Sequence, residues 1–327
     1  MGILLAQFFL HHQELASIQA SSTFSFSWNL LDDVQVIWHF AFMRNAFVAG
    51  TAVALVAALV GYFVVLRQLS FAGHALSHIG FAGATGAILL GMSAMSGLLV
   101  FTMGSALLMG LLGKRLHGRD VVTGIVLAWV LGLGVLFLSL YTGYATEAYA
   151  VLFGQILGIS VRDVFTTVVV SALTLVALVV IYRPLLFASL DEEIAEARGI
   201  PTQGLAIGFM IILAVAVTVA TQVVGVLMIF SLLITPAAIA ERLTTRPPLV
   251  LLTACLIAVL CTWAGLFISF YLPYPVSFFL TSLVFLLYVL VRGTPFVIQS
   301  LRVGKQHHSQ VFQRTQTMNE EPVEVTP

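Results

Sequence analysis

The sequence predicts an all-α protein, a polytopic membrane bundle of about eight or nine transmembrane helices. Composition is the first observation, since 60% of the 327 residues are hydrophobic and only 9% are charged. A soluble domain carries about 25% charged residues, so no aqueous fold could cover this much apolar surface. The second observation is a mean hydropathy of +1.07, and the third is a series of long apolar runs. The lipid bilayer is therefore the expected surroundings of this chain.

Nine apolar runs have the length of about 20 residues with which a helix crosses the hydrocarbon core of a bilayer. They occupy residues 45–67, 70–92, 95–113, 120–141, 161–183, 204–221, 223–242, 249–271 and 275–292. The run 148–160 is too short to cross, and we expect it to enter as a short re-entrant helix surrounded by protein. The sequence thus predicts an N-terminal extension over 1–42, a transmembrane domain over 43–292 and a polar cytoplasmic tail over 293–327.

Basic residues predict the side of the membrane that each loop occupies, because cytoplasmic loops are enriched in Lys and Arg. With nine spans, most of them fall on one side: Arg67, Lys114, Arg115, Arg119, Arg183, Arg198, Arg242, Arg246 and Arg292. We expect this side to be cytoplasmic, although Arg44 and Arg162 fall on the other. The net charge is zero, and without a basic patch the sequence indicates no nucleic-acid partner.

Two histidines stand within a predicted span, in the stretch FAGHALSHIGFAGATG over residues 71–86. His74 and His78 are the only ionisable residues that the sequence places at membrane depth, where such groups mark a transport path or a ligand site. Residues four apart on a helix differ by about 40° of rotation and about 6 Å of rise, so both rings project from one face. Two neutral imidazoles can bind one divalent cation, best zinc but also copper or nickel. The alternative is a pair of hydrogen bonds to backbone carbonyls of neighbouring helices.

The segment 189–201, SLDEEIAEARGIP, has the features of a short helix outside the membrane. Ser189 and Glu192 have the spacing of a capping box, and acidic residues in a first turn suit the positive end of the helix dipole. Gly199 can adopt the left-handed conformation that ends a helix, and Pro201 blocks continuation. This pattern predicts a cytoplasmic helix of about nine residues. It is either an ordinary surface helix or a docking helix for a cytoplasmic motor.

Pro236 interrupts another predicted span, VVGVLMIFSLLITPAAIAERL over residues 223–243. A proline within a helix removes a backbone donor and bends the helix, so Pro236 is either the hinge of a gate or a static kink. The sequence holds no G-x-x-x-x-G-K-[ST] motif, no HExxH and no GxSxG. We therefore expect no enzyme activity, and any ATP hydrolysis that drives the protein belongs to a separate ATPase chain.

Five segments, in order and spacing, resemble the membrane permease subunits of ATP-binding-cassette importers for zinc, manganese and iron, the ABC-3 family. The segments are FMRNAFVAG, GYFVVLRQLSFAGHALSHIGFAGATG, LFGQILGIS, LDEEIAEARGI and VVGVLMIFSLLITPAAIAERL. The resemblance covers about residues 43–292 and implies a multi-pass protein of the bacterial cytoplasmic (inner) membrane. It further implies a second permease copy in a dimer, cytoplasmic ATP-binding-cassette ATPase subunits and an extracytoplasmic metal-binding protein.

The resemblance also implies which residues carry out transport. In the family the metal is carried by an aspartate and a histidine four residues apart; here His78 matches the histidine and His74 stands where many members have the aspartate. Replacing a carboxylate by an imidazole moves the preference from manganese towards zinc. Zn²⁺ is thus the expected cargo, with Mn²⁺ or Fe²⁺ as alternatives, and no cofactor is bound permanently. Residues 189–199 match the ATPase-docking helix, through Asp191, Glu192, Glu193, Ala195 and Gly199.

Two other classes of membrane protein are alternatives to a metal permease. A bis-histidine haem protein needs ligands that face each other from different helices, whereas His74 and His78 lie on one predicted helix. A secondary transporter driven by protons or sodium normally has an intramembrane carboxylate as its coupling group, and the predicted spans contain none in their interior. Within the family reading, a larger metal chelate remains a further possible cargo.

Overall fold

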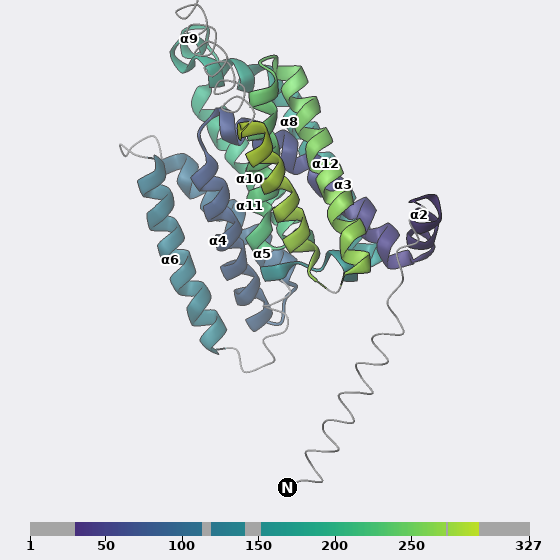
Figure 1. The fold of residues 1–327 in the computed structure, drawn as a ribbon. Coiled ribbons are helices and arrows are strands. Elements are labelled where there is room, and N and C mark those ends of the chain that lie inside the picture. The colour runs from purple at the N-terminus through teal and green to yellow at the C-terminus, as the bar shows by residue number, and fades with distance from the viewer. Residues whose placement is uncertain (1–29, 113–118, 141–151, 273, 294–327) are drawn as a thin grey trace, which may run out of the picture.

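The computed structural model describes residues 30–112, 119–140, 152–272 and 274–293, and within these ranges all regular structure is helical. The helices, drawn in Figure 1, are α2 (Leu30–His39), α3 (Ala41–Leu66), α4 (Ser70–Leu89), α5 (Ala94–Leu112), α6 (Arg119–Leu140), η1 (Ile156–Gly158), α8 (Val161–Leu190), α9 (Glu192–Ala197), α10 (Thr202–Val224), α11 (Val226–Leu243), α12 (Pro247–Tyr271) and the helix Val276–Gly293. The polytopic all-α bundle that the sequence predicts is confirmed.

Each of the nine predicted spans corresponds to one long helix. In the described part of the chain, seven helices are long and apolar enough to cross a membrane. The other two predicted spans correspond to α4 and α11, which carry His74, His78 and Pro236 and pack among the remaining helices. The helices that carry the predicted metal site and the predicted hinge therefore lie inside the bundle.

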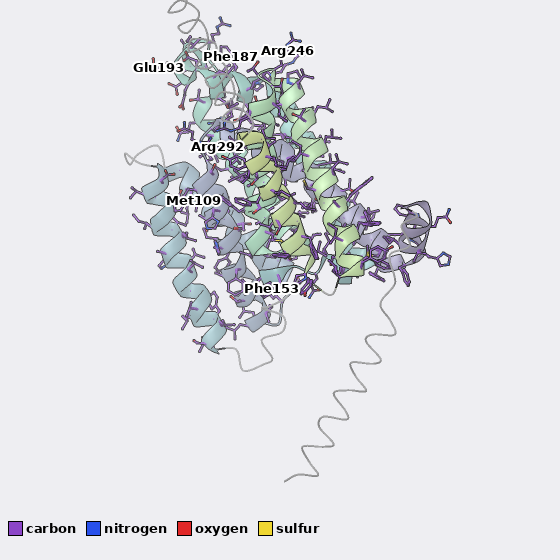
Figure 2. All side chains as sticks on the ribbon, in the orientation of Figure 1. Met109, Phe153, Phe187, Glu193, Arg246 and Arg292 are labelled. Carbon is purple, nitrogen blue, oxygen red and sulfur yellow. The ribbon has the colours of Figure 1, made fainter. Side chains whose placement is uncertain are left out.

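The two ends of the bundle differ in charge. In Figure 2, Glu193 and Arg246 lie together at one end, whereas Phe153 lies at the opposite end. We call the end with Glu193 and Arg246 the basic end, because Arg67 and Arg198 also lie at helix ends there. The loop with Lys114 and Arg115, the tail over 294–327 and residues 1–29 lie outside the described residues. The part of the extension that is described forms α2, a helix that the sequence analysis did not predict.

Helix α8 is longer than predicted. It has 30 residues, a length of about 45 Å that exceeds the roughly 30 Å hydrocarbon core. Arg183, which the sequence analysis placed in a loop, and Ser189, which it expected to cap the next short helix, are both inside α8. Pro184 does not end it, since the helix continues to Leu190 and only then gives way to α9. Figure 1 shows the result, with α9 projecting at the basic end.

Helix α4 lies between α5 and α6, and Figure 1 shows α6 on its outer side. Small residues allow this close packing, as is usual for helices in membranes. A Cβ atom on Gly83 would overlap the carbonyl oxygen of Gly97 in α5, and a Cβ on Gly97 would overlap that of Gly83. Thirteen residues of α4 are buried, most of them alanine or glycine. The α4 backbone is thus held in place on two sides before any functional group is considered.

The predicted re-entrant segment is only partly described, because residues 148–151 lie outside the described ranges. Within 152–160, residues 152–153 are helical and η1 forms a three-residue 3₁₀ turn, so the half-helix stays a prediction. Side chains of neighbouring helices bond to two of its carbonyls: the Asn45 side chain donates to the Ile159 carbonyl at 3.4 Å, and the Ser277 hydroxyl to the Phe153 carbonyl at 3.2 Å. These bonds tie part of its irregular backbone to the bundle.

Candidate metal-transport site

The two imidazole rings share one face of α4. Their centroids are 4.6 Å apart with an interplanar angle of 79°, which is the arrangement expected from a spacing of four residues. Both side chains are half-buried. The ring of Phe230, from α11, lies 4.9 Å from the His74 ring in an edge-on arrangement. The site is therefore formed between α4 and α11, two helices that are far apart in the sequence.

The remaining faces of α4 explain why the histidines point towards α11. Gly80 lies against Leu98 and Thr102 of α5, and Gly86 lies against Phe137 of α6. These glycine faces are about 80° or more away from the histidines around the helix axis. Close packing to α5 and α6 thus orients the imidazoles into the space that those helices leave free.

One imidazole nitrogen has no visible structural purpose. The Nδ1 atom of His74 is buried and has no hydrogen-bond partner among the described residues. Buried polar atoms are nearly always satisfied, so an orphaned imidazole nitrogen is available to bind a ligand. The hydrogen-bonding alternative from the sequence analysis does not account for this atom. Metal binding by the pair stays a prediction.

The chain offers an incomplete metal shell at this point. Among the described residues, no group of three or more His, Cys, Asp and Glu side chains lies close enough to hold one metal ion. Two imidazole nitrogens leave at least two positions of a tetrahedral ion open. Such a site suits a cargo that must be released, because a closed four-ligand shell is typical of structural metals.

Helix α11 contributes two further groups. Pro236 is buried inside the helix, and it removes the backbone donor that would bond to the Leu232 carbonyl. Hinge and static kink remain the two readings of this proline. Glu241, treated in the sequence analysis as a residue at the end of a span, is half-buried within α11. Its spacing of eleven residues, three helical turns, from Phe230 gains meaning only once the structure places Phe230 beside His74.

A short helix is present where the sequence predicts one, but its start differs from the prediction, and its docking role stays a prediction. Helix α9 has six residues rather than about nine, and Asp191 caps it by accepting a hydrogen bond from the Ile194 backbone N–H at 2.9 Å. The predicted capping box of Ser189 with Glu192 is wrong. Because α8 continues to Leu190, the Ser189 hydroxyl instead donates to the Leu185 carbonyl at 2.6 Å.

The end of α9 follows the prediction more closely. Gly199 has a φ of +77°, and the next backbone N–H, from Ile200, donates to the Ala195 carbonyl at 3.1 Å. This is the left-handed helix end that favours glycine. Ala195 is fully buried, so it holds the helix against the bundle rather than facing a partner. Glu193 and Ile194 are exposed, and the sequence analysis had missed Ile194.

A small cavity lies between α9 and the start of α4. Its volume is about 50 Å³, and its walls include Glu192 of α9, Arg67 just before α4, and Ala72 in the first turn of α4. The guanidinium carbon of Arg67 lies 6.0 Å from the centre of the Phe209 ring of α10. The cavity thus lies between α9 and the residues that begin α4.

Comparisons with known proteins agree with this architecture. The sequence model of the ABC 3 transport family matches residues 39–293. The manganese import system permease protein ScaB of Streptococcus parasanguinis is 31% identical over 251 residues, which cover 76% of this chain and 89% of ScaB. The manganese transport system membrane protein MntC of Halalkalibacterium halodurans is 29% identical over 231 residues, or 70% of this chain and 79% of MntC. Among solved structures, PsaBC from Streptococcus pneumoniae in complex with a Fab has a TM-score of 0.72 at 26% identity, covering 80% of this chain and 95% of that chain.

Proposed function

Since the chain belongs to the ABC 3 transport family, as the permease of a metal importer, we propose that it carries a divalent first-row metal past His74 and His78. Manganese is the first candidate for the cargo. The observation that carries this proposal is the pairing of the two imidazoles on one inner helix face, where the buried Nδ1 atom of His74 has no hydrogen-bond partner within the described ranges. The chain is a multi-pass protein of the bacterial inner membrane.

The relatives favour manganese over the zinc that the sequence analysis preferred. ScaB and MntC are both named as manganese transport proteins, and the alternative cargo of the sequence analysis therefore fits better than its first choice. The donor set keeps zinc as a second candidate, since two imidazoles without a carboxylate beside them suit zinc better than manganese. Iron is a third divalent metal that this donor set accepts.

In the proposed transport mechanism, the histidine pair, α9 and the cavity between α9 and α4 each have one step. Metal that arrives from the end opposite the basic end binds the His74 and His78 nitrogens, with water or a second permease copy completing the shell. The exposed face of α9, with Glu193, receives the ATPase at the cytoplasmic side, which is the basic end. In this mechanism α9 and the start of α4 move together, and the cavity lined by Glu192 and Arg67 lies between them. An extracytoplasmic binding protein delivers the metal.

Competition for uptake tests the cargo. The permease is reconstituted in vesicles with its ATPase and binding protein, and uptake of radiolabelled manganese is measured in the presence of unlabelled manganese, zinc or iron. We expect unlabelled manganese to compete best and zinc second. If zinc competes more strongly than manganese, the imidazole pair alone sets the selectivity, and the cargo is zinc.

A further inference from the structure

We propose that Glu241 is a second metal ligand of this permease, an oxygen station that takes the ion from the histidine pair on its way to the basic end. The inference rests on the proposed function and deepens it. It assigns a role to a carboxylate to which the sequence analysis gave none. The argument has three parts: position, burial and donor chemistry.

Position connects Glu241 with the histidines through α11. Phe230 lies 4.9 Å from His74, ring centre to ring centre. Glu241 follows Phe230 by eleven residues on the same helix, so it lies about 16 Å nearer the basic end and only about 20° further around the axis. The carboxylate thus lies nearer the basic end than the histidine pair does, on the same side of α11. Arg242, the next residue, is exposed and points about 100° away.

Burial distinguishes the two sides of α11. One arc of the helix is fully buried and includes Leu233, Ala237 and Ala240. The other arc is half-buried along its length and consists of Phe230, Ser231, Ile234, Thr235, Ala238 and Glu241. This second arc begins at the histidine pair, presents two hydroxyl groups on the way and ends at the carboxylate. It is the side of α11 on which an ion could pass without displacing core side chains.

Donor chemistry makes Glu241 suitable for manganese. Within α4 and α11, Glu241 is the only carboxylate, and carboxylate oxygen is a preferred ligand of manganese. The Glu241 carboxylate interacts electrostatically with the phenol of Tyr62, which also interacts with Tyr182. Tyr62 belongs to α3 and Tyr182 to α8, so Tyr62 has oxygen-bearing side chains of two other helices within electrostatic range near the basic end. The hard anionic oxygen that is missing at position 74 is supplied here, one step further along the path.

Substitutions at Glu241 test the proposal in the complete transporter in vesicles. In Glu241→Gln we expect kcat for manganese uptake to fall by about tenfold with KM unchanged, because loading at the histidines is intact. Glu241→Asp keeps the carboxylate and is expected to retain most of the rate. Asp120→Asn, an exposed carboxylate at the start of α6, is the matched control and should transport normally.

A thiol at this position separates a ligand from a structural carboxylate. A thiolate prefers zinc to manganese, so in Glu241→Cys the ratio of zinc to manganese uptake should rise several-fold above that of the natural protein. Equal losses for both metals in the Gln and Cys variants would overturn the inference, and so would normal manganese uptake in Glu241→Gln. If Glu241→Gln fails to assemble with the ATPase, the metal ratios of the Asp and Cys variants decide the question in its place.

A parallel measurement on His74→Ala separates this inference from the proposed function. Lost uptake in His74→Ala together with normal uptake in Glu241→Gln refutes the oxygen station alone. Normal uptake in both variants refutes the histidine path as well.

Discussion

At the scale of single residues, the central feature is an imidazole at position 74. The spacing of His74 and His78 was sufficient to predict that their rings share a face, because helical periodicity depends on the sequence alone. What lies opposite that face could not be predicted. Phe230 approaches His74 through the packing of α11 on α4, and no local pattern in the sequence encodes which distant helix a face will meet. Glu241 was missed for the same reason.

The substitution His74→Asp tests how this residue sets the cargo. A carboxylate oxygen at this position is a harder ligand than an imidazole nitrogen, so the ratio of manganese to zinc uptake should rise by about tenfold. Initial rates with each metal in reconstituted vesicles measure the ratio. An unchanged ratio would mean that position 74 does not contact the ion.

At the scale of elements, α9 shows where sequence reasoning succeeded and where it failed. Acidic residues at its start and Gly199 at its end predicted a short helix, and both features are present. The predicted cap failed because Ser189 and Asp191 are both good capping residues, and the choice between them depended on how far α8 extends. The predicted docking residues also divide by burial, since Ala195 faces the bundle and Glu193 faces outward.

Charge reversal on the exposed face of α9 tests its role in docking. In Glu193→Lys the rate at which the ATPase associates with the permease should fall roughly fivefold, because charges at the rim of an interface act mainly on association. Surface-immobilised permease and soluble ATPase allow this rate to be measured at low and high salt. The control Asp120→Lys changes the same charge elsewhere and should leave association unchanged. Equal effects of both substitutions would remove α9 as the docking element.

At the scale of the whole molecule, the sequence predicted nine spans, and nine long helices correspond to them. Apolar length could be read directly, because the bilayer requires it. Depth within the bundle could not be read from apolar length, although small residues of α4 such as Gly83 allow the close packing that buries it. The length of α8 was not predicted, since the predicted span ends at residue 183 and the helix continues through Pro184 to Leu190. Tertiary contacts stabilise the helix beyond this proline, and they are not visible in a local pattern.

The most direct test of the account measures metal uptake by the assembled transporter with His74 or His78 replaced singly by alanine. We expect each substitution to abolish uptake, while the permease still assembles with its ATPase and the ATPase still hydrolyses ATP. Loss of uptake with intact assembly would place the ion at the paired imidazoles of α4. Uptake at the natural rate in both variants would show that metal crosses the membrane without them.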